Sequence, residues 1–320
     1  MMPGLISILG DNDLSHHIQE ILTQSKQIPA LYELQLLTTS RYHYFPQKLL
    51  PAALAGLISI DEFCSTADWY RQRNIRRIHT PFYVVHNEAA TDRQCCIDCR
   101  NSGVRILYHA SAATTDDQLI TQADDIASLI PQLMSSRRIG VRSTCAYAIQ
   151  LAFALHKAGR EIVFVTDTPW IDPRMDAEIQ QAISACITRQ GIRMSAGARP
   201  YPQLSVQEDS GEFHIQGEPS LCARVINQLQ DLHDSQPLHI ITIGNTPCHY
   251  LLPTDDLAQL DVLSMSSSRD GLIRKAWLDD NQIRGFVFLG DVAGSKVMHN
   301  LIKNRTDVSA IRHQLLFSAF

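Results

Sequence analysis

Two short turns in this sequence follow an apolar strand pattern and precede an amphipathic helix pattern, which is the setting of a dinucleotide-binding turn. Such a turn uses a G-x-G-x-x-G pattern. The first glycine allows the tight turn, the second lets the backbone approach a pyrophosphate, and the third lets the helix pack closely on the strand. The two turns together have six such positions, which are Gly10, Asn12 and Ser15 in the first turn and Ser143, Cys145 and Ala148 in the second. Only one of the six is a glycine, so the phosphate-binding chemistry of both turns is weakened.

The residues around the first turn are polar and acidic. Asn12 tolerates left-handed backbone angles better than most residues, but its side chain occupies the space that a phosphate needs. Asp11 and Asp13 place negative charge at the start of the helix, where it suits a helix cap and repels a pyrophosphate. The second strand of this unit runs into Thr38-Thr39-Ser40, without the acidic residue that holds a ribose. This pattern favours a capped helix over a dinucleotide site.

The second turn keeps one group with the chemistry of a nucleotide site. Asp167 follows the strand pattern of residues 162–166, where its carboxylate could accept hydrogen bonds from ribose hydroxyls. The alternative is a strand-end carboxylate in solvent or a helix cap. Gly244, in the phrase IGNTP, is either part of the same site or a plain turn glycine. Both residues are candidates for a nucleotide site.

The other reactive residues form no motif of known chemistry. Cys96-Ile97-Asp98-Cys99 is a C-x-x-C pair, but it lies in a strand-rich stretch rather than at a helix start, and no second pair completes a zinc site. The histidines are scattered, and there is no Walker turn, G-x-S-x-G elbow or H-E-x-x-H helix. We therefore expect the eight cysteines to be free thiols, and we assign no metal site and no catalytic residue.

Length and composition indicate a chain with room for about two domains. It has 320 residues, 45% of them apolar, and a formal net charge of −5. No block of Lys and Arg predicts nucleic-acid binding, and no stretch approaches the ~18 apolar residues of a membrane span. The start, MMPGLISILGD, lacks a signal-peptide pattern, so we expect a cytoplasmic protein.

The order of strand and helix patterns predicts an α/β fold. Two strand–turn–helix–strand units begin near Leu5 and Arg138, and residues 77–107 between them suit a small antiparallel meander. The stretch LHIITI, residues 238–243, suits a later parallel strand, and residues 272–289 suit a β-hairpin around Asp279-Asp280-Asn281. We predict two doubly wound, Rossmann-like dinucleotide-binding domains, the second inserted in the first, plus a small C-terminal α+β domain. The expected bounds are 1–115, 116–253 and 254–320, the last being a separate domain or a remnant of the first.

Several phrases stand in an order that resembles one family over nearly the whole chain. They include ISILGDNDLSHHIQEIL at the first turn, YHYFPQKLLPAALAG, YHASAATT, AYAIQLAFALHKAGREIVFVTD at the second unit, and ITIGNTPCHYLL. This order resembles the rubredoxin reductases and the flavin part of the nitrite reductase large subunit. Both are FAD/NAD(P)-dependent oxidoreductases of the pyridine nucleotide-disulfide type.

The resemblance implies FAD in the first unit and NAD(P)H in the second. Lys48 matches the family's basic residue near the isoalloxazine ring, and Ser111 replaces a threonine near the flavin phosphates. Asp291, in FVFLGDVAG, matches either the family's FAD-binding glycine-aspartate motif or its C-terminal hairpin. The implied FAD residues are Gly10, Asn12, Ser15, Lys48, Ser111 and Asp291, and the implied NAD(P) residues are Asp167 and Gly244.

The implied activity is hydride transfer from a nicotinamide to FAD, followed by electron transfer to a small redox protein. A second hypothesis is a degenerate paralogue that holds no flavin and acts as a partner, scaffold or regulator. A third is a nucleotide sensor that keeps only the site of Asp167. The location of Asp291 distinguishes the first two hypotheses, because a place beside the first turn favours the enzyme and a place in a terminal hairpin weakens it.

Overall fold

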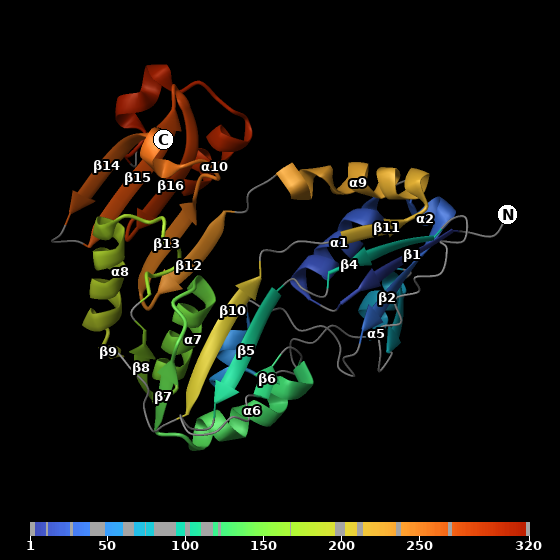
Figure 1. Ribbon diagram of the computed structural model, residues 1–320, viewed down its shortest axis with the longest axis horizontal. Helices are drawn as coiled ribbons and strands as arrows, with labels where there is room; N and C mark the ends of the chain where they lie inside the picture. Colours follow the sequence, from blue (N-terminus) through green and yellow to red (C-terminus); the bar gives the residue numbers. More distant parts are fainter. Residues whose placement is uncertain are drawn as a thin grey trace.

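The computed structural model describes residues 4–10, 12–25, 28–38, 49–59, 67–73, 75–79, 94–99, 103–109, 118–120, 123–166, 168–195, 202–209, 214–234, 238–267 and 271–317. Within them the strands form three sheets, and Figure 1 shows these as three groups of strands. The chain is a mixed α/β protein with parallel strands in two of the sheets, in agreement with the prediction.

The first sheet has four parallel strands and one antiparallel edge strand, in the order β11–β4–β1–β2–β3. Its core contains alternate residues of the strands, such as Ile6 and Ile8, packed against Ile18 and Leu22 of the first helix. Helix α9 packs on α1 and β4 of this layer. The elements are β1 (Gly4–Leu9), α1 (Asp13–Gln24), α2 (Ile28–Leu31), β2 (Tyr32–Thr38), α5 (Ala67–Gln72), β3 (Ile75–His79), β4 (Gln94–Asp98), β11 (His214–Gly217) and α9 (Pro219–Asp234).

The second sheet has the order β6–β5–β10–β7–β8–β9, with β10, β7, β8 and β9 parallel. Helix α7 carries the apolar stripe expected from the sequence, and Ile149, Leu151 and Leu155 are fully buried. The elements are α3 (Leu50–Leu54), β5 (Gly103–His109), β6 (Gln118–Ile120), α6 (Ala123–Ser135), β7 (Arg138–Val141), α7 (Ala146–Lys157), β8 (Glu161–Val165), α8 (Ala177–Arg189), β9 (Arg193–Ser195) and β10 (Gln203–Asp209).

The third sheet is antiparallel and has the order β12–β13–β16–β15–β14. One face shares a hydrophobic core with α7 and α8, to which Ile241, Cys248 and Trp277 contribute. The other face packs on the C-terminal helices through Phe286 and Phe288. The elements are β12 (His239–Ile243), β13 (Thr246–Leu251), η2 (Leu257–Gln259), β14 (Asp261–Ser267), β15 (Leu272–Asp279), β16 (Gln282–Leu289), α10 (Ser295–Lys303) and η3 (Ser309–Gln314).

Two expected strand arrangements are wrong. In the described part of residues 77–107 the expected meander is wrong, because β3 and β4 are parallel strands of the first sheet and β5 belongs to the second. Strand β12, expected as a parallel strand of the second unit, pairs antiparallel with β13 in the third sheet. The chain also returns from the second sheet to the first, since β11 pairs with β4. Short strand patterns predict extended backbone but do not determine the partner strand.

Candidate functional site

The first turn connects β1 to α1 at the edge where β1, β2 and β4 end. Gly10 has φ of +105°, a left-handed conformation that glycine adopts without strain. Its N–H donates to the carbonyl of Leu37 over 3.1 Å, and the N–H of Cys99 donates to the carbonyl of Leu9 over 2.9 Å. These bonds close the carboxyl edge of the first sheet around the start of α1, which is where an open α/β sheet binds its ligand.

Asn12 caps α1 with its own side chain. Its Oδ1 accepts from the N–H of Ser15 over 2.9 Å, and the Ser15 hydroxyl accepts from the N–H of Asn12 over 3.0 Å. The two residues thus form a reciprocal capping box. The Asn12 Nδ2 donates to the carbonyl of Cys99 over 2.7 Å, which ties the cap to the end of β4. Asn12 is 8% exposed and Ser15 is fully buried, so the side chain is held inside the turn.

The second turn connects β7 to α7 and is lined by hydroxyl groups. The Ser143 hydroxyl accepts from the N–H of Val206 over 2.5 Å, and the Thr144 hydroxyl lies 3.2 Å from that of Thr168. Cys145, the N-cap of α7, makes no side-chain capping hydrogen bond. The start of α7 therefore differs from that of α1, because the side chain at its N-cap does not neutralise the positive end of the helix dipole.

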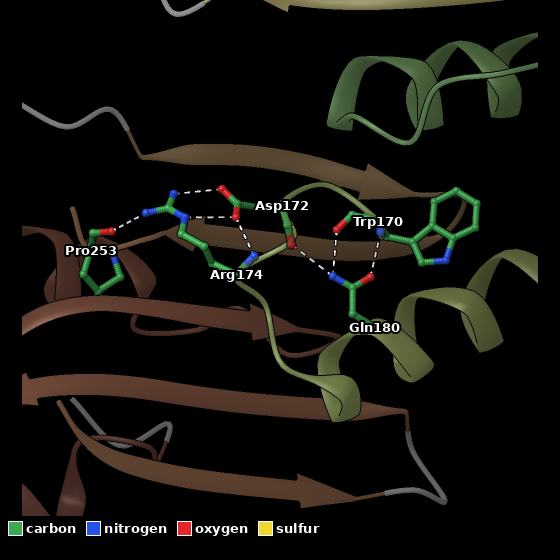
Figure 2. Close-up of polar contacts among 5 residues, drawn as sticks. All are labelled: Trp170, Asp172, Arg174, Gln180 and Pro253. Carbon is green, nitrogen blue, oxygen red and sulfur yellow. Dashed lines mark hydrogen bonds and ion pairs between the residues drawn. The ribbon is translucent and has the colours of Figure 1, made fainter. Parts of the chain in front are cut away.

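The loop after β8 is folded against its neighbours by the polar contacts drawn in Figure 2. The Gln180 side chain of α8 accepts from the N–H of Trp170 over 2.6 Å and donates to the carbonyls of Trp170 and Asp172, each over 3.0 Å. The Arg174 guanidinium binds the Asp172 carboxylate and donates to the carbonyl of Pro253 over 2.6 Å. Burial would raise the pKa of Asp172, but the bonds from Arg174 outweigh it and hold that pKa below its ordinary value. The loop is thus attached both to α8 and to the segment after β13.

A buried lysine joins the third sheet to the start of α8. Lys275 of β15 is 5% exposed, and its Nζ lies 2.5 Å from the carboxylate of Asp176 and 2.7 Å from that of Glu178. Asp176 also caps α8 by accepting from the N–H of Ile179 over 3.1 Å. Burial would raise the pKa of Asp176, but the Lys275 and amide bonds outweigh it, so the net shift is downward. This ion pair positions the third sheet on the second unit.

Comparisons with known proteins agree with this architecture. A scan of protein-family models and a search of curated protein sequences gave no match. Among solved structures, the chain is similar to putidaredoxin reductase in its covalent complex with putidaredoxin, with 11% identity, 95% and 94% of the two chains covered, and a TM-score of 0.67. It is similar to a ferredoxin reductase from Rhodopseudomonas palustris, with 12% identity, 98% and 100% coverage, and a TM-score of 0.69. It is also similar to NADH:rubredoxin oxidoreductase from Clostridium acetobutylicum, with 14% identity, 97% and 97% coverage, and a TM-score of 0.64.

The chain has the fold of these three reductases. The resemblance inferred from the sequence is therefore confirmed at the level of the fold. In this reductase fold a bound FAD would place its pyrophosphate against the start of α1. The donors there do not fit that group, because the side chain of Asn12 already binds the N–H of Ser15 and the carbonyl of Cys99.

The structure brings together three of the predicted site residues, Gly10, Asn12 and Ser15, in the first turn. Lys48, Ser111 and Asp167 lie outside the described residues, as does Asp11. The remaining two predicted residues are Gly244 and Asp291. To contact a dinucleotide, each would have to lie at the edge of a sheet where its parallel strands end, and neither of them does.

Gly244 lies in the turn between β12 and β13, with φ of +63°. The Gln190 side chain accepts from the N–H of Asn245 over 3.0 Å and donates to the carbonyl of Ile243 over 2.9 Å. Gln190 is the C-cap of α8, whereas a nucleotide binds at the edge where parallel strands end and helices begin. The turn-glycine interpretation is thus the one that the structure supports.

Asp291 directly follows β16, and the hairpin of β15 and β16 forms as predicted. Its carboxylate lies 2.7 Å from the guanidinium of Arg274, a side chain that is 1% exposed. Asp291 thus lies at the end of the hairpin and pairs with a residue of the same hairpin, which agrees with the terminal-hairpin interpretation. By the criterion set from the sequence, this location weakens the enzyme hypothesis.

Two other predictions concern absences. Within the described ranges, no group of three or more His, Cys, Asp and Glu side chains could hold a metal ion. In the same part of the chain, no helix combines the length and apolar character that crossing a membrane requires.

Sequence reasoning missed the contacts that link the units. Lys275 and Arg174 each bind a segment that is distant in the sequence, and nothing in the pattern around either residue identifies that segment. A partial signal existed for α8, because an aspartate directly before a helix pattern predicts an N-cap.

Proposed function

We propose that this chain is a flavin-free protein with the reductase fold, and that it acts through a protein partner rather than through its own redox chemistry. The observation that carries the proposal is the side chain of Asn12, which joins the start of α1 to the end of β4. A pyrophosphate at this point would have to displace Asn12 and leave the carbonyl of Cys99 without its donor. The carboxylate of Asp13, in the first turn of α1, adds repulsion toward a phosphate.

The proposed partner is a small redox protein or a flavoprotein reductase. One protein similar in structure to this chain is a reductase held in a covalent complex with putidaredoxin, and another is named for its reaction with rubredoxin. These names describe those proteins. They support a redox partner here because this chain covers at least 94% of each of them.

A second candidate function is an FAD-dependent NAD(P)H oxidoreductase that passes electrons to a small electron carrier. One observation favours it. The fold match covers 98% of this chain and so extends over both dinucleotide-type units. Residues of the second turn would then hold NAD(P)H, with Asp167 on the ribose.

An absorption spectrum distinguishes the two candidates. The purified chain is incubated with excess FAD, desalted and scanned for flavin bands, before and after NADH or NADPH is added. We expect no retained flavin from a folded protein. Near-stoichiometric flavin that is bleached by NADH or NADPH would refute the proposal and establish the oxidoreductase.

A matched variant shows whether the first turn excludes the cofactor. The double substitution Asn12→Gly and Ser15→Gly restores the glycine pattern that starts at Gly10. Flavin uptake by this variant but not by the wild type would assign the exclusion to these two side chains. Calorimetry then tests the proposed partner directly. The flavin-free wild-type chain is titrated with a purified rubredoxin or ferredoxin, and the heat of binding is measured.

A further inference from the structure

Two cysteines far apart in the sequence bring their sulfur atoms close together in the first unit. Cys95 lies on β4 and Cys222 lies in the first turn of α9. Their Sγ atoms are 3.8 Å apart, and both side chains belong to the free thiols of the chain. Cys95 is 2% exposed, whereas Cys222 is only partly buried, so Cys222 is the residue of the pair nearer to solvent.

The backbone around the pair determines this approach. Gly217 of β11 lies directly opposite Cys95 of β4, and a Cβ at Gly217 would clash with the carbonyl of Gln94. The next residue, Glu218, donates its N–H to the same carbonyl over 2.9 Å. The N–H of Cys222 then donates to the carbonyl of Glu218 over 2.9 Å, a hydrogen bond of the first turn of α9. The missing side chain at Gly217 therefore lets α9 begin close to β4.

The C-x-x-C pair of the sequence lacks this geometry. Cys96 and Cys99 are three positions apart along an extended segment, so their side chains point to opposite faces of the sheet. Cys99 is fully buried in the core with Cys95 and Ile97, while Cys96 lies on the other face. The two sulfurs that meet are those of Cys95 and Cys222.

We propose that Cys95 and Cys222 are a thiol pair that a low-molecular-weight disulfide converts to a protein disulfide, which ties α9 to β4. The thiolate of Cys222 attacks one sulfur of the reagent and expels the first thiol, giving a mixed disulfide. The thiolate of Cys95 then attacks the Cys222 sulfur and expels the second thiol. The protein loses two electrons and two protons, and the reagent is reduced to two thiols.

The starting geometry suits this bond. A disulfide needs sulfurs about 2.05 Å apart, so a shift of roughly 1 Å by each sulfur closes the gap through side-chain rotation. Burial, and then the nearby Cys222, raise the pKa of the Cys95 thiol. The raised pKa keeps most of this thiol protonated near neutral pH, so the closing attack by the Cys95 thiolate runs faster as the pH rises. The same thiol is a poor leaving group, so the disulfide, once formed, resists reduction.

Oxidised glutathione tests the proposal on the full-length chain. Reduced protein is incubated with the reagent under native conditions, alkylated, digested and examined by mass spectrometry. We expect a peptide pair joined through Cys95 and Cys222 and the loss of two alkylatable thiols. The Cys222→Ser variant loses this product and Cys96→Ser, on the opposite face of β4, retains it.

A second test uses the wild type alone, so its result does not depend on whether a cysteine variant folds. The disulfide closes a loop that contains every strand of the second sheet, so the oxidised protein should unfold at a higher urea concentration than the reduced protein. Glutathione adducts without the cross-linked peptide, pairing of Cys95 or Cys222 with another cysteine, or a cross-link that forms only in urea would each overturn the proposal.

Discussion

Replacing Asn12 by alanine should destabilise the first unit by about 2–4 kcal/mol. Alanine removes the acceptor for the N–H of Ser15, and loss of an N-cap costs about 1 kcal/mol. It also removes the donor to the Cys99 carbonyl, and an unsatisfied buried carbonyl costs about 1–3 kcal/mol. The two costs add because they fall on different backbone groups, at the start of α1 and the end of β4.

Asn12→Ser separates the two contributions. Serine keeps a hydroxyl that can accept from the N–H of Ser15, but its side chain is too short to reach the carbonyl of Cys99. We expect this variant to lose about 1–3 kcal/mol, the part assigned to that carbonyl. The difference between the alanine and serine variants then measures the cap alone.

Urea unfolding followed by circular dichroism gives these free energies. The matched control is Asp256→Ala, because Asp256 caps the short helix η2 through the N–H of Ala258 at an exposed site. The control should cost less than about 1 kcal/mol, since water replaces the lost bond there. An effect of Asn12→Ala no larger than that of the control would refute the role assigned to Asn12 in closing the first turn.

Two further substitutions test the contacts that join the units. Lys275→Met keeps the apolar stem but loses two ion pairs with half-exposed carboxylates, so we expect a loss of about 1–3 kcal/mol at neutral pH. Because the pKa values of Asp176 and Glu178 are lowered in the folded protein, this stabilisation is present above their ordinary pKa and is lost as the pH falls through the folded values. A difference between wild type and variant that stays constant from neutral to strongly acidic pH would contradict it. Gly244→Ala should cost about 2–4 kcal/mol, because the new methyl clashes with the Gln190 amide at a left-handed φ of +63°. Gly294→Ala, with φ of +82° and open space around the new methyl, measures the backbone cost alone, and equal effects at the two glycines would rule out the Gln190 contact.

Elements with local signals could be predicted from the sequence. The apolar stripe of α7, the aspartate before α8 and the Asp279-Asp280-Asn281 turn each lie within the segment that they specify. In the turn, Asp280 takes the left-handed conformation, with φ of +53°, that such residues tolerate. Helix caps and hairpin turns depend on residues that are neighbours in the sequence, so they can be recognised from a single sequence.

Strand partners could not be predicted in the same way. The phrases QCCID and GVRILYH are close in sequence and both read as strands, yet β4 joins the first sheet and β5 joins the second. The phrase LHIITI contains His239 and Thr242, and β12 pairs antiparallel with its neighbour β13 through the short turn at Gly244 and Asn245. That turn is a local hairpin signal, which the expectation of a parallel strand did not use. For β4 and β5, pairing is decided by packing over long separations, which alternation along one strand does not encode.

The first turn combines both kinds of information. The sequence shows that a side chain at Asn12 must occupy the space of a phosphate, but not that its second partner is the carbonyl of Cys99, 87 residues away. This partner gives the side chain at position 12 a structural role, because Asn12 satisfies polar groups both at the start of α1 and at the end of β4. Restoring glycine at this position would therefore open the phosphate space and remove the Asn12 side chain from the Ser15 amide and the Cys99 carbonyl. In the proposed flavin-free protein, the side chain of Asn12 makes internal bonds that stabilise the fold, so a variant with glycine there needs a bound ligand or a compensating substitution to recover the lost stability.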